Sequence, residues 1–249
     1  MSFENKTLLV TGGASGIGLL SAKNIIKEGG NAVLVDIDAE ALERAKAEIG
    51  VGDERVLCVP TDVRDYEQVV AARDKAVEKF GSIDILLPCA GGAEARLCHT
   101  KGPFHHNPIE VLDFGLDLNL KGALYFCHAV LQQMEKQNSG VIIVMGSVTG
   151  REGSASNIAY SASKSALMNG VVKSLALAGA KFGVRACCVA PGPVLTRPAM
   201  ANMKTLCGRA AETQEIVDLI MYLASEKAAF INGSTIHIDG GRGVMPNKD

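Results

Sequence analysis

A tyrosine and a lysine lie four residues apart in the segment YSASK, at Tyr160 and Lys164. The segment has helical apolar spacing, so both side chains should lie on one helix face, about one turn apart. A phenol is a poor base at neutral pH because its pKa in water is about 10, and a nearby ammonium favours the phenolate. Ser147 follows the run GVIIVMG and is placed to hydrogen-bond a substrate oxygen. Together the three side chains suit proton transfer at a hydroxyl or carbonyl group.

A glycine-rich segment, TGGASGIG at 11–18, follows the first apolar run and precedes a helical pattern. Gly12, Gly16 and Gly18 would let the main chain approach a pyrophosphate held at a helix N-terminus. Asp36 lies 18 residues after Gly18 at the end of the next predicted strand, where a carboxylate binds an adenosine ribose and repels a 2′-phosphate. The segment therefore predicts NAD as cofactor, with capping of the next helix as the alternative role of Asp36.

Short β-rich runs alternate with longer helical patterns along the whole chain, which indicates stacked βαβ units and a parallel sheet. Seven strands are predicted, at 7–11, 32–36, 56–60, 83–87, 141–145, 184–190 and 235–238. Helices are predicted near 17–29, 39–49, 66–79, 109–137, 159–182 and 213–224. We therefore expect an α/β fold in which helices cover both faces of the sheet. The irregular stretches 91–108 and 191–212 each follow a strand, and ligands bind at the carboxyl ends of strands in such sheets.

Composition and charge exclude several classes of function. The 249 residues include 25 Lys and Arg and 27 Asp and Glu, so the net charge is −2, and no long block of one sign occurs. Nucleic acid and anionic membranes are therefore not expected partners. The apolar runs are shorter than the roughly 20 residues that span a bilayer, and no secretory signal is recognised, so we expect a soluble, cytoplasmic protein. The seven cysteines include no CxxC pair, which argues against a disulfide framework or a zinc–thiolate site.

Several motifs occur together in a specific order. They are TGGASGIG, Asp36, Asp62-Val63, AGG at 90–92, NLKG at 119–122, Ser147, YSASK, PGPVLT at 191–196 and IHIDGG near the C-terminus. On these motifs, which span nearly all of the chain, the sequence resembles the classical short-chain dehydrogenases/reductases. The resemblance implies a Rossmann-type, doubly wound parallel sheet in a single domain over 1–249. Its cofactor half would be about 1–140, and its catalytic and substrate half about 141–249.

The resemblance also implies roles for the matching residues. Tyr160 would be the general acid/base, and Ser147 would polarise the substrate oxygen. Lys164 would activate Tyr160 and bind the nicotinamide ribose, and Asn119 would support a water-linked proton relay. The implied cofactor-binding residues are Gly12, Ser15, Gly16, Ile17, Gly18, Asp36, Ile37, Asp62, Val63, Ala90, Gly91, Tyr160, Lys164, Pro191, Gly192, Val194 and Thr196.

The implied activity is the NAD-dependent interconversion of a secondary alcohol and a ketone, with a small molecule as substrate. The implied assembly is a homotetramer in which helices near 109–137 and 159–182 pair between subunits. The alternative is a cofactor-bound regulatory or scaffold protein without turnover, against which the retained catalytic residues argue. A serine hydrolase is excluded because GSVTG around Ser147 is not the GxSxG nucleophile elbow.

Two features depart from the family pattern. Pro88-Cys89 stand where the family usually has Asn-Asn, and Pro88 predicts that the fourth strand ends there. We interpret Cys89 as a packed, inert thiol, with oxidation sensitivity as the alternative. The stretch 92–108 is longer than the usual family connection and 196–206 is shorter, and we expect both to shape the substrate site.

Three residues near these stretches are predicted to face the substrate: Gly92, Arg151 and Glu152. The three histidines of the first stretch, His99, His105 and His106, lack the spacing of metal ligands. We therefore expect no metal site and interpret them as surface or subunit-contact residues.

Overall fold

A parallel sheet of seven strands forms the centre of the molecule in the computed structural model, which describes residues 2–246. The strand order is β3-β2-β1-β4-β5-β6-β7. The strands are β1 (Thr7–Thr11), β2 (Asn31–Asp36), β3 (Val56–Pro60), β4 (Ile85–Pro88), β5 (Gly140–Met145), β6 (Val184–Pro191) and β7 (Ser234–Ile238). Every pairing is parallel, so each connection crosses a face of the sheet. The doubly wound α/β fold predicted from the sequence is confirmed.

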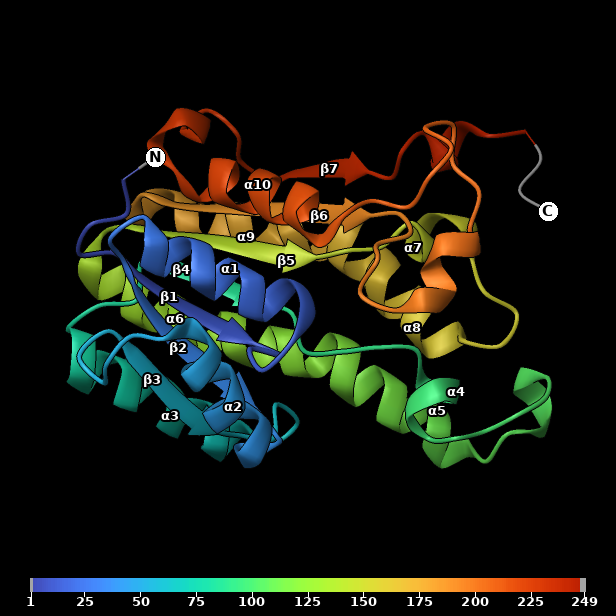
Figure 1. Cartoon of the computed structure of the whole chain (residues 1–249), viewed down its shortest axis with the longest axis horizontal. Coiled ribbons are helices and arrows are strands. Elements are labelled where there is room, and N and C mark those ends of the chain that lie inside the picture. Colours follow the sequence, from blue (N-terminus) through green and yellow to red (C-terminus); the bar gives the residue numbers. More distant parts are fainter. Residues whose placement is uncertain (1, 247–249) are drawn as a thin grey trace.

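Helices cover both faces of this sheet, and each face has its own apolar core. The first core includes side chains of α1 (Gly16–Lys27), α2 (Ala39–Ile49) and α10 (Thr213–Ala224); the second includes those of α3 (Tyr66–Phe80), α6 (Gly122–Gln137) and α9 (Val172–Gly179). Figure 1 shows α1 and α10 on the side of the sheet opposite to α6 and α9. Successive strand residues alternate between the cores: Leu8 belongs to the first and Leu9 to the second. Because both faces of the sheet are covered, its central strands are rich in Val, Leu and Ile.

The two longest helical patterns are interrupted by π turns. The helix expected near 109–137 consists of α5 (Ile109–Leu116), a π turn (Asp117–Lys121) and α6. The helix expected near 159–182 consists of α8 (Ile158–Ala166), a π turn (Leu167–Val171), α9 and a 3-10 turn (Ala180–Phe182). Neither π turn was predicted from the sequence; such turns are rare and occur mostly as single-turn insertions inside α-helices. Two single-turn helices, α4 (Glu94–Leu97) and α7 (Thr149–Glu152), lie in segments expected to be loops.

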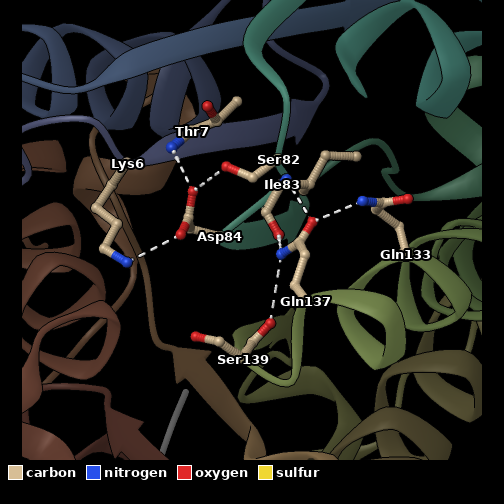
Figure 2. A network of polar contacts seen from close by, with 8 residues as sticks. All are labelled: Lys6, Thr7, Ser82, Ile83, Asp84, Gln133, Gln137 and Ser139. Carbon is tan, nitrogen blue, oxygen red and sulfur yellow. Dashed lines mark hydrogen bonds and ion pairs between the residues drawn. The ribbon is translucent and has the colours of Figure 1, made fainter. Parts of the chain in front are cut away.

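A polar network fixes the amino end of β4, as Figure 2 shows. Asp84 accepts hydrogen bonds from Lys6 Nζ at 2.9 Å, from the Thr7 main-chain N–H at 3.0 Å and from Ser82 Oγ at 2.8 Å. The Gln137 side chain pairs with both the N–H and the C=O of Ile83, each at 3.0 Å. Since both main-chain groups of Ile83 are engaged by a side chain, the strand begins at 85 and not at 83 as the sequence pattern predicted.

Within residues 2–246, no helix combines the length and the apolar character that crossing a membrane requires.

Candidate active site

A cavity of about 770 Å³ opens at the carboxyl ends of the strands. The strand order reverses between β1 and β4, which is the place where open parallel sheets bind their ligands. Figure 1 shows the strands β5, β6 and β7 pointing toward the end of the molecule where α4, α7 and α8 lie. The segment after β1, the loops after β2 to β6 and helix α8 all contribute to the wall of the cavity.

The N-terminus of α1 forms one wall. Ser15 precedes the helix, and no side chain among the described residues caps its first N–H groups. Those N–H groups and the helix dipole are therefore available to an anion. Gly18 allows α1 to start close to β1, because a Cβ at this position would overlap the carbonyl oxygen of Gly12. The wall has the form that a bound pyrophosphate requires.

Asp36 lies at the end of β2 and lines the same cavity. Its carboxylate accepts hydrogen bonds from the main-chain N–H groups of Ala14 and Asp38, each at 3.3 Å. The cap of the next helix is Asp38, which accepts a hydrogen bond from the Ala41 N–H at 2.9 Å. The structure thus assigns capping to Asp38 and leaves Asp36 facing the cavity.

Asp62 is paired with Arg64, a cavity residue that nothing in the sequence pattern marks. Nη2 of Arg64 lies 2.6 Å from Oδ2 of Asp62, and Nε lies 2.9 Å from Oδ1. The hydrogen bond from this guanidinium lowers the pKa of the Asp62 carboxyl below its ordinary value. The guanidinium also lies 5.1 Å from the ring centroid of Phe114. This end of the cavity therefore carries one paired acid and one acid, Asp36, without an ion-pair partner among the described residues.

Tyr160 and Lys164 lie on α8, as their spacing predicted, and both line the cavity. The ammonium of Lys164 lies 5.5 Å from the centroid of the phenol ring. Lys164 is buried, and its Nζ donates a hydrogen bond to the Met145 carbonyl at 2.8 Å. Ser147, directly after β5, is also buried, and its Oγ accepts a hydrogen bond from the Thr149 N–H at 3.1 Å. The Ser147 hydroxyl hydrogen therefore stays available to a ligand in the cavity.

Asn119 does not line the cavity but supports its floor from the π turn between α5 and α6. Its Oδ1 accepts a hydrogen bond from the Gly92 N–H at 2.8 Å, and its Nδ2 donates to the carbonyls of Gly92 at 3.0 Å and Gly115 at 2.9 Å. A π turn shifts the main-chain bonds by one residue, so the Gly115 carbonyl can accept this side-chain donor. Gly91 lies between Asn119 and Lys164, since a Cβ there would be 2.5 Å from Oδ1 and 4.0 Å from Nζ. A proton relay through Asn119 stays a prediction.

Glu94 holds the first turn of α8, although nothing in the sequence pattern marks it. The side chain is buried, with 3% of the residue exposed. Its Oε1 accepts a hydrogen bond from the Ala159 N–H at 2.8 Å, and its Oε2 accepts one from the Tyr160 N–H at 3.1 Å. A carboxylate is favourable at this place because the N-terminus of a helix is positive. The position of Tyr160 therefore depends on a side chain from α4, 66 residues earlier in the chain.

Every residue of the predicted cofactor-binding set lines this one cavity, and so does Gly92. Their binding of a cofactor or substrate stays a prediction. Arg151 and Glu152 are not among the described residues that line it. Glu152 instead accepts a hydrogen bond from Arg242 Nε at 3.2 Å, and Arg151 is exposed. The substrate contact expected of these two residues stays a prediction.

Cys89 and the histidines do not add chemistry to the cavity. β4 ends at Pro88, as the proline predicted, and Cys89 follows in the cavity wall. Burial raises the pKa of the Cys89 thiol to about 12, which fits the interpretation as an inert group. The rings of His105 and His106 contact each other, with centroids 4.3 Å apart. Within residues 2–246, no group of three or more His, Cys, Asp or Glu side chains is arranged to hold a metal ion.

Comparison with known proteins relates the whole chain to one group of oxidoreductases. The family model of the short chain dehydrogenases matches residues 6–206. The chain is 33% identical to cis-4-hydroxycyclohexanecarboxylate dehydrogenase of Sinomonas cyclohexanicum, over 96% of this chain and 97% of the relative. It is 32% identical to 2-dehydro-3-deoxy-L-rhamnonate dehydrogenase (NAD(+)) of a Sphingomonas species, over 96% of each chain. The crystal structure of an NAD+-bound xylitol dehydrogenase superposes with a TM-score of 0.85 at 27% identity, covering 97% of this chain and all of the other.

Proposed function

Because the chain belongs to the short-chain dehydrogenase family, we propose that it is an NAD-dependent oxidoreductase that interconverts a secondary alcohol and a ketone. The observation that carries the proposal is the meeting of Tyr160, Lys164 and Ser147 in one cavity with the N-terminus of α1. The buried ammonium supports the phenol as a proton acceptor, and the serine hydroxyl can bind the substrate oxygen. The helix end beside them can hold the cofactor's phosphates, so the arrangement suits hydride transfer at an alcohol carbon.

The residues present suit NAD as the cofactor. The uncapped N–H groups of α1 suit a pyrophosphate, and the carboxylate of Asp36 has lone pairs left to accept hydrogen bonds from ribose hydroxyls. A 2′-phosphate would meet this carboxylate, and the guanidinium of Arg64 nearby in the wall is already paired with Asp62. When bound, NAD supplies a nicotinamide ring that accepts a hydride from the alcohol carbon.

The side chains of the cavity provide the accompanying proton transfer. In the oxidation direction, Tyr160 as phenolate takes the hydroxyl proton of the alcohol, and in reduction it returns the proton to the ketone oxygen. Ser147 donates a hydrogen bond to the same substrate oxygen. Lys164, oriented by the Met145 carbonyl, stabilises the negative charge on the phenolate. Asn119 holds Gly92 and the floor of the site in place.

The proposal is tested by a screen of secondary alcohols with NAD and with NADP, following the absorbance of the reduced nicotinamide. We expect Tyr160→Phe to lower kcat by about 10²–10⁴-fold, the contribution typical of a general base, while NAD still binds. Tyr222→Phe, a change on the exposed face of α10, is the matched control and should retain full activity. Turnover that survives Tyr160→Phe would overturn the catalytic assignment, and turnover absent from the wild-type protein across the panel would favour the regulatory alternative.

We also propose that the protein works as a homotetramer in the cytoplasm. Large apolar side chains support the assembly: Leu177 on α9 is 81% exposed and Ile109 on α5 is 62% exposed, and these helices belong to the patterns expected to pair. All seven cysteines are free thiols, which suits a reducing compartment. Light scattering should give a mass near four times 26.1 kDa, and a monomer would contradict the assembly. Cell fractionation tests the location.

A further inference from the structure

Six of the described charged residues line the cavity, and both acids among them lie at one end of it. They are Asp36, Asp62, Arg64, Arg96, Lys164 and Arg197. Both acids follow β2 and β3, and Arg64 is paired with one of them. At the other end the described lining includes three cations and no carboxylate. Behind this lining, the buried carboxylate of Glu94 is bonded to the Ala159 and Tyr160 N–H groups. Three cations therefore face one nearby carboxylate, and the net positive charge around Tyr160 favours an anionic ligand.

Two of these three cations have no structural task that the described residues reveal. Lys164 is buried and bonded to a carbonyl, but the guanidinium of Arg96 has neither a hydrogen bond nor an ion pair with any residue in 2–246. The guanidinium of Arg197 has a single polar neighbour among those residues, the Met200 sulfur at 3.8 Å. Burial and the positive charge of Arg197 both lower the pKa of Arg96, while Tyr160 opposes this shift. Arg96, Arg197 and Tyr160 line the same cavity, and Arg96 lies within electrostatic range of both of the others.

The position of Arg96 is set by its neighbours. It lies on the single turn α4, two residues after Glu94, which is bonded to the first turn of α8. Its guanidinium lies against Gly92, since a Cβ at residue 92 would be 2.5 Å from Nη2. The main chain of Gly92 is itself held on both sides by Asn119. The loop therefore presents this cation to the reacting end of the cavity.

We propose that Arg96 and Arg197 form a subsite for an anionic group, carboxylate or phosphate, carried by the substrate. Guanidinium groups bind such oxygens through two parallel hydrogen bonds, and an anion between two unpaired cations relieves their repulsion. The substrate class is then a hydroxy acid or hydroxy phosphate whose alcohol carbon lies beside Tyr160. The inference rests on the proposed function for the identity of the reacting group but not for the binding of the anion.

The test compares benzoate, benzamide and phenyl phosphate as ligands in isothermal titration calorimetry, with the full chain saturated with NAD. We expect one of the two anions to bind at least about tenfold more tightly than benzamide. Arg96→Met and Arg197→Met should each reduce this anion-to-benzamide affinity ratio about tenfold, because a charge-assisted hydrogen bond contributes about that factor to binding. Arg44→Met, on an exposed side chain of α2, is the matched control and should retain the ratio. Whichever anion is preferred identifies the substrate as a carboxylate or a phosphate.

Several results would overturn the subsite. The first is equal affinity of the wild-type chain for the anions and for benzamide. The second is an anion-to-benzamide affinity ratio that survives when Arg96→Met and Arg197→Met are combined. The third is an Arg197→Met variant that loses affinity for NAD while its anion-to-benzamide affinity ratio is unchanged. If Arg96→Met does not fold, Gly92→Ala replaces it, because the new methyl group displaces the guanidinium. The benzoate and benzamide titrations are repeated without NAD. If the chain binds benzoate more tightly than benzamide but does not bind NAD, the proposed function is contradicted and the anion subsite is not.

Discussion

Replacing Glu94 by alanine should loosen the helix turn that carries Tyr160. The change leaves two buried N–H groups of α8 without the carboxylate that accepts their hydrogen bonds at 2.8 and 3.1 Å. A hydrogen bond to a charged group contributes about 1.5–3 kcal/mol, and loss of a helix cap costs about 0.5–2 kcal/mol. These terms overlap, so we expect a loss of about 2–3 kcal/mol in the free energy of unfolding. For a chain of this size that lowers Tm by about 4–12 °C.

The assay combines thermal denaturation with steady-state kinetics on an alcohol that the screen identifies. Glu94→Gln keeps one acceptor oxygen, so it should lose about half as much stability as Glu94→Ala. Because Glu94 sets the position of Tyr160, kcat should fall in both variants while NAD affinity is unchanged. Glu78→Ala, at an exposed position of α3, is the control and should shift stability by less than about 0.5 kcal/mol. A Glu94→Ala chain as stable as that control, or a destabilised one with unchanged kcat, would refute the reasoning.

The other predictions concern the cofactor end and the thiols. Asp36→Ala should raise the preference for NADP over NAD by about tenfold in kcat/KM, because it removes an acceptor for the ribose and the repulsion of a 2′-phosphate; an unchanged preference would contradict the assignment. The hydrogen bond from Arg64 lowers the pKa of Asp62, so its stabilising effect should be full at pH values above the ordinary carboxyl range and be lost as pH falls through the lowered pKa. The Tm difference between wild type and Asp62→Asn should therefore stay constant from pH 8 to about pH 5 and narrow only below about pH 4. Iodoacetamide at pH 8 should label the exposed Cys207 but not Cys89, whose thiol pKa is raised to about 12, and peptide mass mapping that finds both equally labelled would contradict this.

The sheet could be predicted from local sequence patterns, and most of the cavity wall from the resemblance to the short-chain dehydrogenases/reductases. A glycine segment between a strand and a helix, or a Tyr and a Lys one helical turn apart, is determined by residues that are neighbours in the chain. The parallel arrangement then brings the carboxyl ends of the strands together, so Asp36, Ser147 and Tyr160 had to meet at one edge of the sheet. The residue at which each strand begins was less predictable. The start of β4 at Ile85, for example, depends on the Gln137 side chain, which binds the main chain of Ile83.

The residues that could not be predicted act through long-range contacts. Glu94 and Arg96 appear in the sequence as an isolated acid and base in a loop, and no spacing relates them to α8 or to Arg197. Arg151 and Glu152 illustrate the opposite case. They are close to Ser147 in the sequence, but they lie on the single turn α7 and are not among the described residues that line the cavity, and Glu152 is bonded to Arg242. Proximity to Ser147 in the sequence therefore does not by itself place a residue in the cavity wall. Their contact with a substrate stays a prediction.

The single turn α4 carries two residues for which we propose different tasks. Residues two apart on a helix point about 200° away from each other, so Glu94 can face the first turn of α8 while Arg96 faces the cavity. One side chain positions the catalytic phenol, and the other selects the charge of the substrate. Changes at 96 should therefore alter specificity with little effect on the turnover of a neutral alcohol, whereas changes at 94 should lower turnover for every substrate. Because the two effects differ in their dependence on substrate charge, comparing kcat and KM for a charged and a neutral alcohol in the same two variants separates positioning from recognition.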